Sequence, residues 1–359
     1  MINSEIAHRR LRNQGLSKII FKDTLDVVTQ LGAVQAQDYT GAKWALGQRL
    51  KDSSDAALDK LFNDGSILRT HLLRPTWHFV APSDIRWLLK LTAPRAHAVN
   101  AFMYRGEGLD KTILKKSYVV LEKALQGNKQ RTRTELASAF EKAGIHAQGF
   151  RLGYIMMSAE LDGVICSGAR HGKQFTYALL EERVPPVKPL TRDESLAELA
   201  RRYFTTRGPA TVNDFAWWSG LTVSDAKRGV ELVKPQLGSE AMEGQTYWFK
   251  ESKPPPKEKS PTAYLLPNYD EYFIGFKDRS AIGDIAKQEG IKGDDPALIA
   301  HIVILDGQIV GGWRRTLEKN KVVVELNLFA KLTKPERQAI LIAAERYGKF
   351  LGLPVEIST

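Results

Sequence analysis

The sequence predicts an α+β protein made of three tandem winged-helix modules and a C-terminal β-rich, barrel-like domain. Two observations predict this fold class. Three consecutive segments repeat one order of elements, namely helices, a tight turn, a further helix and a glycine-punctuated β pair. After these segments, apolar residues alternate with polar ones, as is typical of strands. The 359 residues are also too many for one ordinary core.

The repeats divide the chain into four expected parts: 1–108, 109–187, 188–252 and 253–359. The first part has the least regular pattern of the three modules. Its apolar spacing predicts helices and then one strand, in the order 4–14, 23–34, 54–63 and 76–80.

The second module shows the repeated pattern most clearly. Its expected helices and strands cover 118–125, 135–143, 149–161, 164–166 and 174–179. Thr134 is expected to begin the middle helix. The two strands flank a loop that contains Arg170, His171 and Lys173. A β hairpin with a basic tip is where a winged helix contacts phosphates.

The third module repeats this order. Its expected helices and wing strand cover 196–204, 212–219, 224–233 and 247–250. Thr211 follows a Gly-Pro turn and is the expected N-cap of the second helix.

A proline run at 254–256 indicates a linker before the C-terminal domain. In that domain Asp306–Gly307 is the expected hairpin turn. Strands and a final helix are expected at 264–275, 301–316, 321–329 and 335–351.

The charge of the chain favours a polyanionic partner. The formal net charge is +11, and residues 111–151 carry nine basic against three acidic residues, a net of +6. A solvated helical surface would account for part of this excess, but such local concentration favours nucleic acid.

Several classes of protein do not fit the sequence. No apolar run approaches the roughly 20 residues of a membrane span, and the first residues lack the apolar core of a signal peptide, so we expect a cytoplasmic protein without a membrane partner. Cys166 is the single cysteine, so an internal disulfide or a thiolate cluster is excluded and a buried thiol is expected. Phosphate-loop, zinc-protease and nucleophile-elbow motifs are absent, and we expect neither a metal nor another cofactor.

Two stretches carry the strongest functional signal. In the first, Gln35 and Gln37 alternate with small apolar residues, and extended backbone would put both amides on one face. The alternative is that the two glutamines satisfy loop backbone groups. The second stretch, residues 68–80, combines cations, imidazoles and Trp77 before a strand. Its alternative is a wing strand with Trp77 and Phe79 in the core and His78 facing solvent.

These stretches resemble the winged-helix DNA glycosylases of the AlkZ/YcaQ type, which unhook interstrand crosslinks. The resemblance spans nearly the whole chain and rests on five segments: VQAQD, LLRPTWHFV, ELDGVICSGARHGKQFTYALL, LLPNYDEYFIGFKDR and LDGQIVGGWRRT. It implies three tandem winged helices with a C-terminal β domain. It also implies a catalytic Gln-apolar-Gln motif, here Gln35-Ala36-Gln37, as in the azinomycin-resistance branch. Asp38 and Tyr39 directly follow the motif and are given a supporting role.

The amide chemistry fits one class of reaction. Alkylation at N7 of guanine or N3 of adenine makes the base cationic and a good leaving group. An amide is too weak a base to deprotonate water, but it orients water and supplies a dipole. We therefore expect a monofunctional glycosylase, since no lysine stands out as a Schiff-base former.

The expected partner is double-stranded DNA that is alkylated or crosslinked, bound by a monomer that associates with the nucleoid. Bulky adducts cannot be extruded into a tight pocket, so an open basic surface is expected. The candidate contacts along the cleft and the phosphates are Arg69, His71, Arg74, Trp77, His78, Arg131, Arg133, Arg170 and Lys173.

Two alternatives remain open at this point. The first is a non-catalytic winged-helix DNA-binding protein such as a transcription regulator, because fold alone does not determine function. Repetition of the module and the Gln35/Gln37 pair argue against it. The second is an RNA or protein scaffold, which only the basic charge supports.

Overall fold

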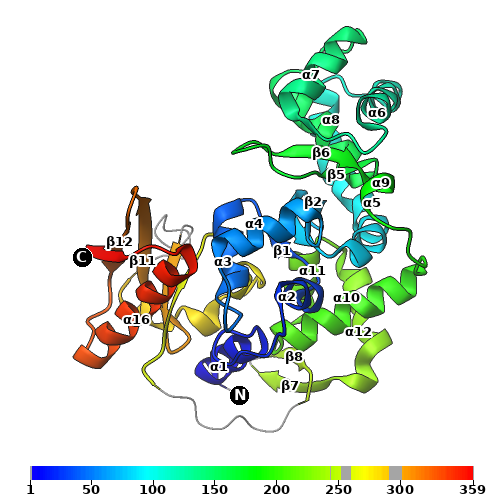
Figure 1. Ribbon diagram of the computed structural model, residues 1–359. Coiled ribbons are helices and arrows are strands. Elements are labelled where there is room, and N and C mark those ends of the chain that lie inside the picture. Colours follow the sequence, from blue (N-terminus) through cyan, green and yellow to red (C-terminus); the bar gives the residue numbers. More distant parts are fainter. Residues whose placement is uncertain (1, 243, 252–259, 291–300, 359) are drawn as a thin grey trace.

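The computed structural model describes residues 2–242, 244–251, 260–290 and 301–358. Helices surround four separate sheets of three, five, three and two strands (Figure 1). The predicted α+β class is confirmed. The expected linker at 254–256 lies outside the described residues.

The first segment folds around a small antiparallel sheet of order β1-β3-β2. Its strands are β1 (Val34–Gln35), β2 (Leu68–Leu72) and β3 (Thr76–Val80), and the last has the predicted bounds. The helices are α1 (Asn3–Asn13), α2 (Thr24–Leu31), α3 (Tyr39–Gly47) and α4 (Asp55–Asp64). The sequence pattern predicts three of these helices and does not predict α3.

A single long helix leads away from this segment. Helix α5 (Pro82–Gly106) has 25 residues and contains Pro94. Proline removes a backbone hydrogen bond inside a helix, so its presence weakens the helical pattern of the sequence. This explains why the sequence analysis did not predict α5.

The second segment forms a lobe that projects from the rest of the molecule (Figure 1). It contains α6 (Lys111–Leu125), α7 (Arg133–Lys142), α8 (Gly149–Leu161) and the short α9 (Leu180–Arg183). Its sheet has the order β4-β6-β5, from β4 (Arg131–Thr132), β5 (Ile165–Ser167) and β6 (Thr176–Leu179). Thr132 caps α7 through a capping box with Glu135, so the predicted start at Thr134 was wrong by two positions.

The lobe has a hydrophobic cluster of its own, which includes Leu121, Phe140 and Ile155. Its β5–β6 loop reaches back to the first segment, where the Arg170 backbone N–H donates to Asn63 over 2.8 Å. Cys166 is fully buried, as expected, and burial raises the pKa of its thiol to about 12.

The third segment contains α10 (Arg192–Arg207), α11 (Val212–Ser219) and α12 (Val223–Val233), followed by the hairpin β7 (Gly238–Met242) and β8 (Gln245–Phe249). Thr211 caps α11, as predicted. Its core is shared with the first segment, because Leu72, Leu88 and Trp218 belong to one buried cluster.

The C-terminal part is built on one five-stranded sheet of order β13-β12-β11-β10-β9. Its elements are β9 (Ala263–Leu266), α13 (Glu271–Ile274), α14 (Asp284–Gln288), β10 (His301–Leu305), β11 (Gln308–Leu317), β12 (Val322–Leu328), α16 (Lys334–Leu351) and β13 (Val355–Ser358). The hairpin turn at Asp306–Gly307 is confirmed, and both residues have positive φ.

Two expectations for this part were wrong. Among the described residues the sheet is open, with β13 and β9 at its edges, so the predicted barrel-like closure is absent. The strand expected over 264–275 ends at Leu266, because the Asp270 side chain accepts a backbone hydrogen bond from Tyr272 and begins α13.

Glu271 joins three parts of the chain through a fully buried ion pair. One carboxylate oxygen accepts from Arg207 over 2.6 Å and from the Trp218 indole N–H over 2.9 Å. The other accepts from the Gln35 backbone N–H over 2.9 Å. Burial opposes ionisation, but Arg207 and these donors outweigh it and hold the pKa of Glu271 below its ordinary value.

The neighbouring residue makes a second buried pair. Both oxygens of Asp270 accept from Arg49, each over 2.8 Å. The start of α13 is thereby attached to the first segment twice, because Arg49 lies just beyond α3.

A search of the described helices finds none with the length and apolar character that a bilayer crossing requires.

We predict that Glu271→Gln lowers the free energy of unfolding by about 3–5 kcal/mol, because it leaves the Arg207 charge buried without a partner. Urea unfolding at neutral pH measures this loss. The matched control is Glu231→Gln, whose partner Lys234 lies 3.3 Å away in an exposed pair and whose loss should be small. Equal losses for the two variants would contradict a structural role of the buried pair.

The same pair predicts a dependence on pH. The pKa of Glu271 is lower in the folded state than its usual value of 4.5, so its stabilisation is present above that pH and disappears as the pH falls through the folded-state pKa. The difference in stability between wild type and Glu271→Gln should therefore shrink in acid. A difference that stays constant between pH 7 and the acid transition would refute this assignment.

Candidate active site

The two glutamines lie at the end of β1, where the strand leaves its sheet. Gln35 pairs with His78 of β3, and this is the last pair of the ladder. Gln37 lies in a bend before α3. Gln35 is buried while Gln37 is exposed, so the two amides occupy different environments although they lie close in sequence. Strand β1 ends at Gln35, so regular strand backbone does not continue through both residues.

Gln35 is held from two sides. Its backbone N–H donates to Glu271, and its side-chain oxygen accepts from the Arg74 guanidinium over 3.1 Å. These contacts come from the C-terminal part and from the β2–β3 turn. The side chain therefore has a defined position before any substrate binds.

Gln37 replaces a ladder hydrogen bond with its side chain. The Ala36 N–H donates to the Trp77 carbonyl oxygen over 2.7 Å, but the Trp77 N–H donates to the Gln37 side-chain oxygen over 3.4 Å. An amide oxygen has two lone pairs, so one acceptor site of Gln37 stays free for a further donor.

A stack of aromatic and cationic side chains lies beside the motif. The Arg69 guanidinium lies between Trp77, at 4.3 Å from the ring centre, and Phe175, at 4.6 Å. Its Nε donates to the Ala36 carbonyl oxygen over 3.0 Å. The ring of His71 packs on Trp77, and its Nδ1 lies 2.5 Å from Glu160 of α8.

Three candidate DNA contacts are buried and serve the scaffold in this structure. Arg69, His71 and His78 are at most 8% exposed. Burial lowers the pKa of His78 to about 4, so its imidazole is neutral at pH 7. A neutral imidazole that donates from Nδ1 to Thr76, over 2.8 Å, offers no charge to a phosphate. Arg74 and Trp77 are half-buried.

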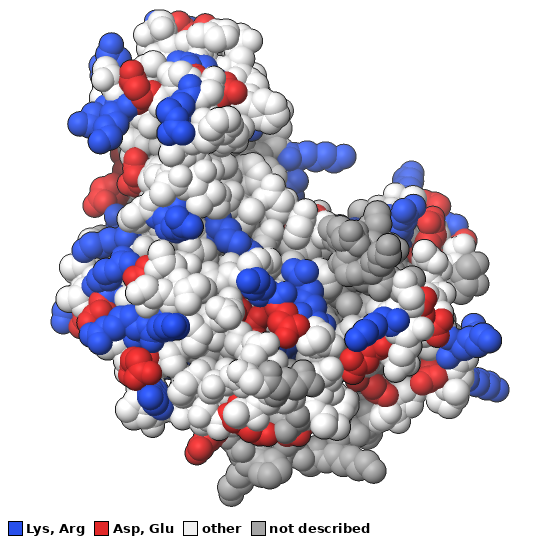
Figure 2. Space-filling view, turned by 180° about the vertical axis from the view of Figure 1, so that it is seen from behind, with Lys and Arg blue, Asp and Glu red and all other residues white. Residues whose placement is uncertain are grey.

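The other candidate contacts lie on the projecting lobe. Arg133 and Lys173 are exposed, whereas Arg131 and Arg170 are half-buried. Arg131 donates to the Ala124 carbonyl oxygen over 2.9 Å. Figure 2 shows basic side chains on this lobe and a hollow between the lobe and the C-terminal part. The six lysines of the basic segment are exposed: Lys111, Lys115, Lys116, Lys123, Lys129 and Lys142.

The two residues after the motif connect it to its neighbours. Asp38 caps α3 by accepting from Gly41, and it accepts from Arg315 of β11 over 3.3 Å. The Tyr39 hydroxyl donates to Asp59 over 2.7 Å. Burial is the main cause that raises the pKa of Tyr39, and the hydrogen bond to Asp59 raises it further.

Four residues of the site were missed in the sequence analysis. Glu271 and Arg207 fix the backbone of Gln35, Trp217 lies against Arg74, and Arg279 lies over the same indole ring. Glu271 and Arg279 fall inside the segment LLPNYDEYFIGFKDR, whose resemblance was noted, but no local pattern distinguishes them.

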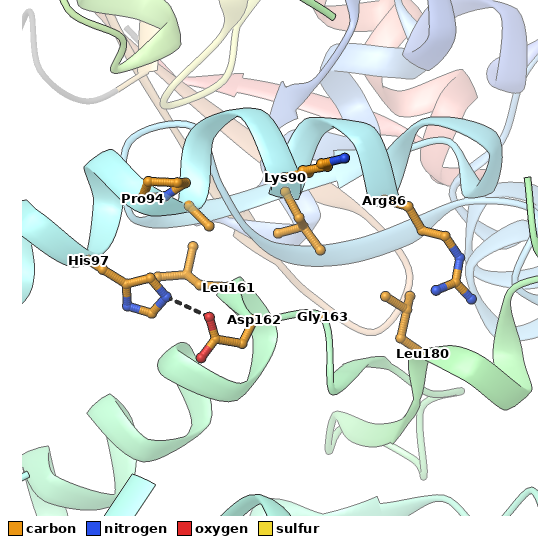
Figure 3. Close-up of a pocket in the computed structure, with 10 residues that line it drawn as sticks. Arg86, Lys90, Pro94, His97, Leu161, Asp162, Gly163 and Leu180 are labelled. Carbon is orange, nitrogen blue, oxygen red and sulfur yellow. Dashed lines mark hydrogen bonds and ion pairs between the residues drawn. The ribbon is translucent and has the colours of Figure 1, made fainter. Parts of the chain in front are cut away.

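A separate pocket of about 420 Å³ lies between α5 and the end of α8 (Figure 3). Its lining includes Arg86, Lys90 and the pair of His97 and Asp162, in which His97 Nε2 lies 3.0 Å from Asp162 Oδ1. No residue of the Gln35–Gln37 motif lines it.

Comparisons with known proteins agree with this arrangement. The family model described as DNA glycosylase AlkZ-like matches residues 28–350. An interstrand DNA cross-link repair glycosylase of Streptomyces sahachiroi is 23% identical over 320 residues, which is 85% of each chain. The solved structure of the Streptomyces sahachiroi DNA glycosylase AlkZ matches with a TM-score of 0.80 and 20% identity, over 99% of this chain and 98% of that one. The resemblance predicted from sequence is confirmed, and the protein belongs to the AlkZ-like DNA glycosylase family.

Proposed function

We propose that this protein is a monofunctional DNA glycosylase that hydrolyses the N-glycosidic bond of cationic alkylated purines, including N7-alkylguanines, bulky adducts and interstrand crosslinks. The printed name of the Streptomyces sahachiroi relative, an interstrand cross-link repair glycosylase, supports the crosslink substrate. The Gln35–Gln37 pair supports the chemistry.

One observation carries the proposal: two neutral amides lie next to carboxylates whose oxygens already accept hydrogen bonds from the protein. Glu271 accepts from Arg207, Trp218 and the Gln35 backbone. Asp38 accepts from Gly41 and Arg315. Neither carboxylate is free to act as a strong general base, so the site suits a reaction whose leaving group is already activated.

We assign the roles of the two amides from their environments. Exposed Gln37 has a free acceptor site, and it orients the attacking water beneath the anomeric carbon. Buried Gln35 is held by Arg74 and Glu271, and its dipole faces the positive charge that develops on the sugar. Positioning of this kind contributes several kcal/mol to lowering a barrier, up to roughly 7–11 kcal/mol in the most favourable cases.

The proposed substrate is double-stranded DNA, held by a monomer without a metal or other cofactor. We propose that residues 1–108, 109–187 and 188–252 act as three winged-helix modules, and that the second one tracks the DNA backbone with its exposed basic residues. An open surface rather than a closed pocket leaves room for a bulky adduct. Such binding to DNA is consistent with a nucleoid-associated protein.

The second candidate is a non-catalytic winged-helix DNA-binding protein. A regulator binds one DNA sequence tightly and releases no base, whereas the proposed enzyme responds to the lesion. The hydrogen bonds that hold Gln35 in its buried position favour the enzyme, because recognition of a DNA sequence does not require a buried amide.

We predict that Gln35→Ala and Gln37→Ala each lower base release from a duplex with a single N7-methylguanine by about 100-fold, the scale of losing one preorganised dipole. DNA affinity should stay within a few-fold of wild type. Single-turnover release of the base and fluorescence anisotropy measure the two quantities.

The matched control is Gln30→Ala on α2, whose amide nitrogen donates to Asp26 over 3.3 Å. Wild-type protein that binds these duplexes but releases no base from methylated or crosslinked DNA would disprove the enzyme and favour the regulator.

We also predict that Lys173→Ala reduces the slope of log affinity against log salt by about 1, and weakens binding equally for all DNA sequences. The reason is that an exposed cation at the tip of the β5–β6 loop releases one counterion from the DNA. Lys349→Ala on α16, whose side chain is 80% exposed, is the control and should leave the slope unchanged. An unchanged slope for Lys173→Ala would remove the loop from the DNA interface.

A further inference from the structure

Two arginines without an ion pair lie over the Trp217 ring, and one of them, Arg74, contacts Gln35. The Arg74 guanidinium lies 4.1 Å from the centre of the Trp217 ring, and that of Arg279 lies 5.4 Å from the same centre. Arg74 donates to the Gln35 side chain, and Arg279 donates to the Phe273 carbonyl oxygen over 3.1 Å. Within the described ranges, neither guanidinium lies within ion-pair distance of a carboxylate.

Other deep arginines of this chain are arranged differently. Arg49, Arg202 and Arg207 are each paired with a buried carboxylate, at 2.8, 2.5 and 2.6 Å. Arg10 and Arg69 also lack a carboxylate. Arg69 shares the Phe175 ring with Arg170, but Arg170 is paired with Asp59 over 3.5 Å. Arg74 and Arg279 differ because two cations without a carboxylate share one indole. Burial lowers the pKa of both groups, to about 10 for Arg74, and each remains charged at pH 7.

The placement of this pair is built into the fold. Gly220, which ends α11, has φ of +68°, and a Cβ at this position would lie 3.0 Å from the Arg74 backbone nitrogen. Glycine thus permits the β2–β3 turn to pack directly against the end of the helix that carries Trp217. Arg279 follows α13, which Asp270 and Glu271 attach to the same region.

The unpaired charges have a consequence for the proposed reaction. A cationic base and a positively charged sugar bound at Gln35 would be repelled by Arg74 and Arg279, unless an anion neutralises the two arginines. In a DNA substrate the anion closest to the sugar is a phosphodiester group. A guanidinium has five N–H donors, and Arg74 uses one of them on Gln35.

We propose that Arg74 and Arg279 together bind one phosphodiester group directly next to the damaged nucleotide, with Trp217 supporting both guanidinium groups. The bound phosphate neutralises the pair and fixes the sugar over Gln35 and Gln37. This inference rests on the proposed glycosylase function and names the substrate group that the same site recognises.

The test replaces single phosphates in the substrate. Duplexes carry one N7-methylguanine with a 2′-fluoro sugar, which prevents base release, and one neutral methylphosphonate at each flanking linkage in turn. We expect wild type to lose roughly tenfold in affinity at one linkage next to the lesion. Arg279→Gln should lose part of this affinity with unmodified phosphates, and the methylphosphonate at that linkage should cost it clearly less than it costs wild type, because only Arg74 still contacts the phosphate.

The matched control is Arg337→Gln at an exposed position of α16, which should keep the full methylphosphonate effect. Losses that add in Arg279→Gln, or an equal effect at every linkage, would overturn the proposal. If Arg279→Gln melts at a lower temperature, Arg279→Lys is used, because it keeps the charge without the bidentate guanidinium. Its loss of affinity should be intermediate, and full additivity with the methylphosphonate in this variant also overturns the proposal. Base release from unmodified DNA is measured separately, so failure of the enzymatic function is distinguished from failure of the phosphate contact.

Discussion

The position of the glutamine motif depends on one buried carboxylate. Strand β1 has only two residues, and the Gln35 backbone N–H finds its partner in Glu271, 236 positions further along the chain. Arg207 neutralises this carboxylate and also donates to the carbonyl oxygens of Leu31 and Ala33, which flank the approach to β1. The motif therefore takes its geometry only when the first, third and C-terminal parts are folded together. The family model likewise matches nearly the whole chain, over residues 28–350.

The charges around the motif are divided between its two sides. On one side Glu271 and Arg207 cancel each other in a fully buried pair. On the other side Arg74 and Arg279 carry net positive charge against Trp217. Gln35 thus lies between a neutral ion pair and unpaired cations. This environment suits a substrate that contains both an anionic group and an already activated leaving group. The phosphate and the cationic base of alkylated DNA together have this character.

Short-range sequence patterns predicted the helices and strands that are determined by residues close together in the chain. Strand β3, helix α8 and helix α11 have the predicted bounds, because alternation, apolar spacing and the Thr211 cap act within a few residues. Alternation with apolar residues singled out Gln35 and Gln37, and the family resemblance implied their catalytic role. The burial of His78 was not predicted, because a strand pattern does not state which face is covered. Glu271 was missed since its partners are distant in sequence. The open edge of the C-terminal sheet likewise depends on pairing that no local pattern encodes.

The lobe and the motif are connected through side chains that the sequence analysis assigned to DNA. Arg69 donates to the Ala36 carbonyl oxygen within the motif and lies against Phe175 of the β5–β6 loop, while its backbone N–H donates to Ser167 of β5. His71, two residues further along β2, contacts Glu160 of α8. These contacts are buried, so they resist changes in angle between the lobe and the motif. The distance from the exposed basic residues of the lobe to Gln37 is therefore set by the scaffold, as the proposed binding of DNA across the lobe and the motif requires.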